Sequence, residues 1–138
     1  MKLNKVHHIA IIASDYPRSK SFYCDILGFT LLSEVYRAER DSWKGGLALN
    51  GDYTIELFSF PQPPARVSQP EACGLRHLAF SVDDIDSAVT HLAQHQIRCE
   101  PIRIDPYTER RFTFFTDPDG LPLELYQATN RLKNSTNC

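Results

Sequence analysis

The pattern of apolar and polar positions predicts a similar unit in each half of the chain. In the first half, an apolar, β-branched run predicts a strand over 6–13. Ser14-Asp15 then supplies the cap of a helix that ends at Gly28. The strands predicted after this helix span 29–38, 43–49 and 53–60. The first half therefore has the order βαβββ.

The second half repeats this order. A strand over 75–82 is followed by a helix that Asp83-Asp84 caps, and the later strands span 97–104, 110–116 and 121–127. Turn signals at Lys44-Gly45-Gly46 and Asn50-Gly51-Asp52 flank or interrupt the strand over 43–49, and Asp117-Pro118-Asp119-Gly120 forms the last turn. The expected fold class is α+β, with two βαβββ modules.

A proline-rich connector separates the two halves. Four prolines between residues 60 and 70 exclude a helix or a central strand there. We expect one domain over 1–138, in which the first module spans about 5–60, the connector 61–73, the second module about 74–127 and a poorly ordered polar tail 128–138. The connector permits the modules to pack within one chain or across two chains, and both arrangements stay open.

A His and a Glu recur in both modules at nearly the same spacing. His8 and Glu56 are 48 residues apart, and His77 and Glu124 are 47 apart. Because strand side chains alternate between faces, each of these residues points to the less apolar side of its strand. A buried Glu is costly unless it is paired or coordinated. Two imidazoles and two carboxylates suit one Ni²⁺, Zn²⁺, Co²⁺, Mn²⁺ or Fe²⁺ ion, so we expect a metal centre.

The remaining histidines and the cysteines are weaker candidates. His7 points away from His8, and Arg76 replaces it in the second module, so we expect a structural or surface role. His91 and His95 have ligand spacing on the predicted helix, but no third ligand is near them in sequence, which favours a solvated face. The cysteines form no C-x-x-C pair and are expected to be free thiols: Cys24, Cys73, Cys99 and Cys138.

The amino-acid composition limits which kinds of binding partner are expected. A net charge of −2, 42% hydrophobic residues and 23% charged residues are ordinary for a globular protein. There is no block of Lys and Arg, which disfavours nucleic acid and membrane surfaces as partners. The sequence starts without a signal-peptide pattern and has no long apolar run, so a cytoplasmic location is expected. The expected partner is a small-molecule substrate.

Four stretches of the sequence resemble the glyoxalase I-like branch of the vicinal oxygen chelate superfamily. They are His8-Ile9-Ala10-Ile11, Phe22-Tyr23-Cys24-Asp25-Ile26-Leu27-Gly28-Phe29, Gly74-Leu75-Arg76-His77-Leu78-Ala79-Phe80-Ser81-Val82-Asp83-Asp84 and Asp117-Pro118-Asp119-Gly120-Leu121-Pro122-Leu123-Glu124-Leu125. The resemblance runs from about Val6 to Gln127. It implies paired βαβββ modules in a partly closed barrel with the helices outside, a homodimer, and a metal-dependent lyase similar to lactoylglutathione lyase.

The resemblance also implies roles for individual residues. His8, Glu56, His77 and Glu124 would be the ligands of one divalent ion, with Ni²⁺ or Zn²⁺ favoured. The ion would polarise a carbonyl group and stabilise an enediolate, with Glu124 as the leading base and Glu56 as the second candidate. Because branches that cleave aromatic rings or open fosfomycin usually use two His and one Glu, the presence of Glu56 favours the glyoxalase-like branch.

Two departures from the family pattern concern the substrate. Ile12 and Phe60 stand where similar bacterial enzymes have an Arg and an Asn that help to hold glutathione. This suggests that the native substrate is not a glutathione adduct. An Fe²⁺ dioxygenase, a metal-dependent thiol transferase and a non-catalytic small-molecule-binding protein on the same scaffold remain alternatives.

Four residues are candidates for contacts with the substrate. Arg110 and Arg111 suit a carboxylate or a phosphate, with a solvated strand start as the alternative. Trp43 and Phe58 are candidates for the apolar wall of a pocket, with ordinary core packing as the alternative.

Overall fold

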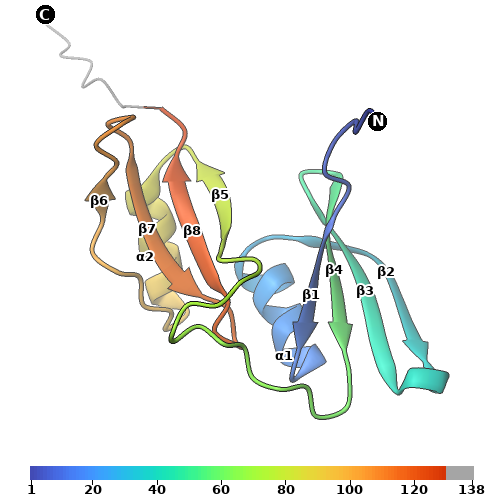
Figure 1. The fold of residues 1–138 in the computed structure, drawn as a ribbon. Helices are drawn as coiled ribbons and strands as arrows, with labels where there is room; N and C mark the ends of the chain where they lie inside the picture. Colours follow the sequence, from blue (N-terminus) through green and yellow to red (C-terminus); the bar gives the residue numbers. More distant parts are fainter. Residues whose placement is uncertain (130–138) are drawn as a thin grey trace, which may run out of the picture. The chain divides into compact units, whose positions relative to one another are not determined.

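The structure is a computed structural model that describes residues 1–129, and these form two compact units (Figure 1). One unit contains Met1–Arg66 and Asp117–Asp119, and the other contains Val67–Thr116 and the chain from Gly120 onward. Each unit carries one four-stranded sheet, which confirms the α+β class. Cys138 and the expected disorder of the tail beyond residue 129 lie outside the described residues.

The first unit follows the predicted order. Its elements are β1 (Ile9–Ala13), α1 (Tyr16–Ser21), the π-helical segment η1 (Phe22–Ile26), β2 (Thr30–Arg37), the 3-10 turn η2 (Ala38–Arg40), β3 (Ser42–Leu49) and β4 (Asp52–Ser59). The sheet order is β1-β4-β3-β2, with β1 parallel to β4 and the other pairs antiparallel. The Asp15 carboxylate accepts a hydrogen bond from the Arg18 amide at 3.1 Å, which confirms the predicted cap.

The second unit has the same topology. Its elements are β5 (Leu78–Val82), α2 (Ile85–Gln94), β6 (Arg103–Ile104), β7 (Arg111–Thr116) and β8 (Pro122–Gln127). Its sheet order is β5-β8-β7-β6, in which β5 is parallel to β8. The Asp84 carboxylate accepts hydrogen bonds from the amides of Asp86 and Ser87, so this helix is also capped as predicted. No helix within residues 1–129 has the length and apolar character needed to cross a membrane.

In the first unit, α1 packs on one face of the sheet (Figure 1). Ile55 and Leu57 are fully buried on this face. Gly45 pairs with Leu57, and Tyr16 of α1 lies so close to Gly45 that a Cβ atom would clash with it. Glu56 alternates with these residues and therefore projects from the opposite face.

The second unit buries its sheet in the same way. Leu123 and Leu125 are buried on either side of Glu124. The next residue on their face, Gln127, accepts a hydrogen bond from the first amide of α2, that of Ile85, at 3.4 Å. Strand alternation therefore directs Glu124 away from α2.

Two details of the predicted strands are wrong. Gly45 and Gly46 lie inside β3 and form no turn, because both pair with β2 and β4 and their missing side chains leave room for tyrosine rings. The strand predicted over 97–104 is reduced to Arg103–Ile104. Pro101, which has no N–H to donate, lies within this stretch.

Candidate metal centre

Both histidines stand one residue before the first strand of their unit. His8 precedes β1 and His77 precedes β5, so the strands predicted from residues 6 and 75 begin later than expected. In each unit the Glu pairs with the residue two positions after the His, namely Ala10 with Glu56 and Ala79 with Glu124. The same register therefore places both His–Glu pairs, and in each pair the two side chains share a face.

The distances within the two pairs are similar. His8 Nε2 lies 3.4 Å from Glu56 Oε1, and His77 Nε2 lies 3.1 Å from Glu124 Oε2. Two donor atoms, each about 2.1 Å from one divalent ion, stand about 3.0 to 3.4 Å apart in octahedral or tetrahedral geometry. Each pair therefore fits two adjacent ligands of one ion. Among residues 1–129, no group of three or more His, Cys, Asp or Glu is arranged to hold a metal. Each unit brings together one His and one Glu, and such a pair is termed a candidate half-site.

The Glu56 carboxylate has two further partners. The Tyr53 hydroxyl donates to Glu56 Oε2 at 2.8 Å, and Lys44 Nζ lies 3.6 Å from the same oxygen. Burial acts to raise the pKa of Glu56, but the Tyr53 hydrogen bond and the charges of His8 and Lys44 outweigh it and lower the pKa. Burial, with the bond to Glu56, raises the pKa of Tyr53 to about 12. Glu56 is thus an ionised carboxylate with a neutral phenol as its donor at neutral pH.

His7 contacts the candidate ligand beside it. The Nδ1 atoms of His7 and His8 are 2.8 Å apart, so one ring donates to the other. If His8 is the donor, its Nε2 carries a free lone pair toward Glu56, which is the form that binds a metal. Both rings also pack against Tyr53, at centroid distances of 5.4 and 5.9 Å. His7 is exposed, as expected, but the prediction that it points away from His8 is wrong, because its ring contacts both His8 and Tyr53.

The second half-site lacks this support. His77 Nδ1 is buried and has no hydrogen-bond partner within the described part of the chain. The His77 ring packs edge-on against Phe114, with 5.1 Å between centroids. Leu121 and Phe112 hold the positions equivalent to Tyr53 and Lys44. The carboxylate of the first half-site therefore has additional polar partners, whereas the histidine of the second packs against an aromatic ring.

The side chain of Arg111 is turned away from the Glu124 carboxylate. Both terminal nitrogens of Arg111 bind the Asp86 carboxylate of α2, at 2.8 and 2.9 Å. Arg111 therefore lies on the helix side of its sheet. Arg110 precedes β7, and its carbonyl accepts a hydrogen bond from the Asp105 amide at 2.8 Å.

The two predicted aromatic residues lie on opposite faces of the first sheet. Trp43 stacks on Tyr16 of α1 with centroids 5.6 Å apart, so it belongs to the helix side. Phe58 lies two residues after Glu56 and pairs with Lys44, so it shares the Glu56 side. Of the two aromatic candidates, Phe58 is the one that shares a face with a His–Glu pair.

Comparisons with known proteins agree with this architecture. Residues 5–125 match the family model of the Glyoxalase/Bleomycin resistance protein/Dioxygenase superfamily. The chain is 77% identical to the uncharacterized protein YaeR of Escherichia coli (strain K12), over 91% of this chain and 97% of that protein. It is 61% identical to the uncharacterized protein YwkD of Bacillus subtilis (strain 168), over 92% of this chain and 99% of that protein.

A solved structure is also similar. The crystal structure of the glyoxalase family protein from Enterococcus faecalis superposes with a TM-score of 0.84 at 46% identity, and the match covers 91% of this chain and 99% of that chain. The range matched by the family model includes His8, Glu56, His77 and Glu124.

Proposed function

Because this chain belongs to the Glyoxalase/Bleomycin resistance protein/Dioxygenase superfamily, we propose that it is a divalent-metal-dependent lyase or isomerase of the glyoxalase I type. The observation that carries the proposal is the duplicated His–Glu pair. The same register produces it twice, and the donor atoms stand 3.4 and 3.1 Å apart. The proposed substrate is a small oxygenated compound.

In this proposal the two half-sites share one ion. His8, Glu56, His77 and Glu124 would hold Ni²⁺ or Zn²⁺, because two imidazoles and two carboxylates suit these ions and two donors alone bind an ion weakly. The units that share the ion belong to one chain or to the two chains of a homodimer. When bound, the ion supplies Lewis acidity that acidifies a C–H group beside a carbonyl.

The Glu56 and Glu124 carboxylates have different surroundings, which favours different roles for the two. Glu56 is held by Tyr53 and Lys44 as well as by His8. The partner of the Glu124 carboxylate among the described residues is His77. A general base must move its carboxylate between the proton and the ion, and this favours the less restrained Glu124. We assign proton transfer to Glu124 and ion binding to Glu56, which remains the second candidate for the base.

Two residues on the Glu56 side argue against a glutathione adduct as the substrate. Ile12 is more than half exposed, and Phe60 stacks against Phe58. Neither side chain offers a hydrogen bond to a tripeptide, since both are hydrocarbon. The enzyme is therefore proposed to act on another oxygenated compound.

Metal titration tests the proposal most directly. The purified chain is titrated with Ni²⁺ and Zn²⁺ by calorimetry, next to His8→Ala and His77→Ala variants, and each is assayed with methylglyoxal and glutathione. We expect one ion per chain, weaker binding in both variants, and little turnover of the glutathione adduct. Absence of metal binding, or equal metal affinity in the wild type and both variants, would overturn the metal centre. Rapid turnover would overturn the exclusion of glutathione, and oxygen uptake with Fe²⁺ would contradict the lyase assignment.

A further inference from the structure

Two basic side chains follow Glu56 along the same face of the first sheet. Lys44 pairs with Phe58, two residues beyond Glu56, and Arg37 pairs with Ser42, two residues from Lys44 on β3. Paired residues of antiparallel strands share a face. At about 3.3 Å per residue, each two-residue step is about 7 Å, so Arg37 stands about 13 Å from Glu56 along the strand direction and two strands to the side.

Arg37 is held in place by aromatic packing. Its guanidinium carbon lies 5.0 Å from the centroid of Phe58 and 5.8 Å from that of Phe60, and these two rings stack on each other. Its Nη2 donates to the Ser42 hydroxyl at 2.9 Å. Cation–π contacts and one neutral acceptor fix the group but leave its charge in place.

Among residues 1–129 Arg37 lacks a carboxylate partner, whereas Lys44 is paired with Glu56. In the described part of the chain, Arg37 makes no ion pair, and its buried Nε has no hydrogen-bond acceptor. The carboxylate near Lys44 is Glu56, which is also bonded to Tyr53 and paired with His8. A partly buried charge without a counterion is unfavourable, and an anionic ligand would relieve it.

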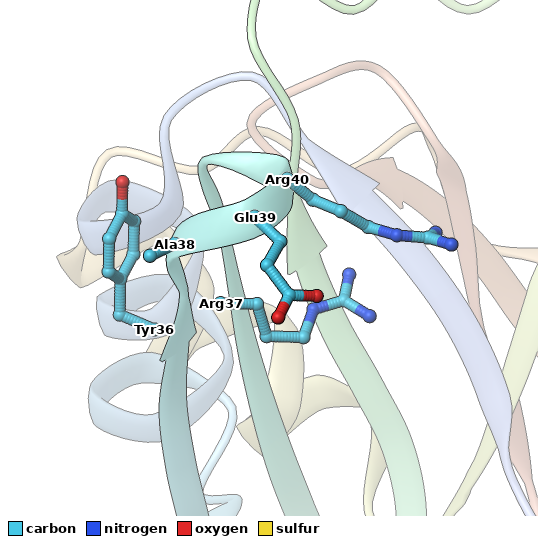
Figure 2. Close-up of a pocket in the computed structure, with 5 residues that line it drawn as sticks. All are labelled: Tyr36, Arg37, Ala38, Glu39 and Arg40. Atoms are coloured by element: carbon cyan, nitrogen blue, oxygen red, sulfur yellow. The ribbon is translucent and has the colours of Figure 1, made fainter.

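A hollow lies next to Arg37. Residues 36–40 line a cavity of about 440 Å³, and Figure 2 shows the side chains of Arg37 and Arg40 extending away from Tyr36. The lining carries two arginines against one acidic side chain, that of Glu39. The hollow is open to solvent, and its charge balance favours an anion.

We propose that Lys44 and Arg37 form an anion subsite that selects substrates with a carboxylate or phosphate group. The guanidinium binds two oxygens of such a group, and the lysine adds a point charge. This inference rests on the proposed function, in which the metal would bind the other end of the substrate. It defines the substrate as a small organic acid or phosphate ester whose anionic group lies on the Arg37 side of Lys44, up to about 13 Å along the strands from Glu56.

The test uses inorganic phosphate and malonate as probes of the two acid types. Binding is followed by calorimetry, because the single tryptophan, Trp43, lies on the helix side of the sheet and would not report on Lys44 and Arg37. The full chain is titrated as purified, after chelation and after reloading with Ni²⁺. Arg37→Gln and Lys44→Gln are compared with Arg98→Gln, a change at an exposed arginine of the other unit.

We expect at least one probe to bind, and the tighter one identifies the acid type. Arg37→Gln should weaken binding about tenfold or more and Lys44→Gln by a smaller factor, with no change in Arg98→Gln. Arg37→Lys, which keeps the charge and the stem over the rings, should recover part of the affinity. This variant separates loss of the subsite from loss of folding.

Failure of both probes to bind, or equal affinity in wild type and Arg37→Gln, would overturn the subsite. Its failure is distinguishable from failure of the proposed function. If the chain binds Ni²⁺ but no anion, only the proposed anion subsite is contradicted. If the chain binds the anion at Arg37 after chelation but never binds metal, only the proposed metal centre is contradicted.

Discussion

The Tyr53 hydroxyl donates a hydrogen bond to Glu56 Oε2, although Tyr53 lies only three residues before Glu56 on the same strand. Simple alternation would direct side chains at this spacing to opposite faces. The pairing of β3 with β4 shifts register between Leu47 and Ala48, and such irregularities redirect nearby side chains. The first half-site thereby gains a fixed carboxylate that the second half-site lacks.

Replacing Tyr53 by Phe should weaken metal binding. The change removes the donor to Glu56 and keeps the ring against His7 and His8. Loss of a partner that orients a metal ligand typically costs about 10- to 100-fold in metal affinity. Competition titration with Ni²⁺ and Zn²⁺ measures the change. Tyr107→Phe is the matched control, because the Tyr107 side chain is fully in solvent. Equal affinities in the two variants would contradict the role given to Tyr53.

Replacing Gly46 by Ala should disturb the same contact from the neighbouring strand. A Cβ atom at Gly46 would stand 2.6 Å from Tyr53 Cε2 and 2.6 Å from Ser33 Oγ, so the ring must shift. Overpacking of this kind costs about 1–3 kcal/mol. Urea unfolding measures the loss of stability, and a metal titration should show weaker binding as in Tyr53→Phe.

Gly45→Ala is the control for Gly46→Ala. A Cβ atom at Gly45 clashes with Tyr16 on the helix side of the same strand. This variant should lose stability but keep the metal affinity of the folded protein. If both alanine variants bound metal equally well, the packing of Tyr53 over Gly46 would have no part in the site.

Replacing Glu124 by Gln should stop proton transfer and leave much of the metal bound. The amide keeps an oxygen for the ion but is too weakly basic to take a proton from carbon. Deuterium uptake from D₂O into a carbonyl substrate, followed by NMR, measures the proton transfer, and metal content is measured on the same sample. Glu56→Gln should mainly lower metal content. The reverse pattern would exchange the roles of the two residues.

The sequence was sufficient to predict the overall plan of the fold but not its finer pairing. Period-two alternation around Glu56 and Glu124 predicted their faces, and the caps at Asp15 and Asp84 predicted the helix starts. These features depend on neighbours in the chain. The glycines of β3 suggested a turn because local propensity contains no information on the rings that pack over them.

Contacts between distant residues explain what the sequence did not predict in the candidate site. Lys44 and Arg37 reach the Glu56 side through the pairing of β2, β3 and β4, and their positions follow from the register. Arg111 was a reasonable candidate for an anion, but its guanidinium is bound by Asp86, 25 residues away. A basic residue therefore becomes informative only when its carboxylate partners are known.

Stability at alkaline pH should depend on Tyr23. This side chain is fully buried, and its hydroxyl donates to Asp117 Oδ2 at 2.8 Å. Burial, followed by the charge and hydrogen bond of Asp117, raises the pKa of Tyr23 far above its ordinary value. The unfolded chain therefore releases this proton near pH 10 while the folded chain retains it. The contribution of Tyr23 is complete below about pH 10 and is lost progressively above it.

For one such group the free energy of unfolding falls by up to about 1.4 kcal/mol per pH unit. Urea unfolding between about pH 9 and 11 measures this slope. Tyr23→Phe should lower stability by about 1–3 kcal/mol at neutral pH, because the Asp117 carboxylate loses a donor, and should flatten the alkaline slope. Tyr107→Phe should leave the slope unchanged, since its exposed hydroxyl has similar surroundings in the folded and unfolded chain. An equally steep slope in Tyr23→Phe would show that other groups cause the alkaline loss.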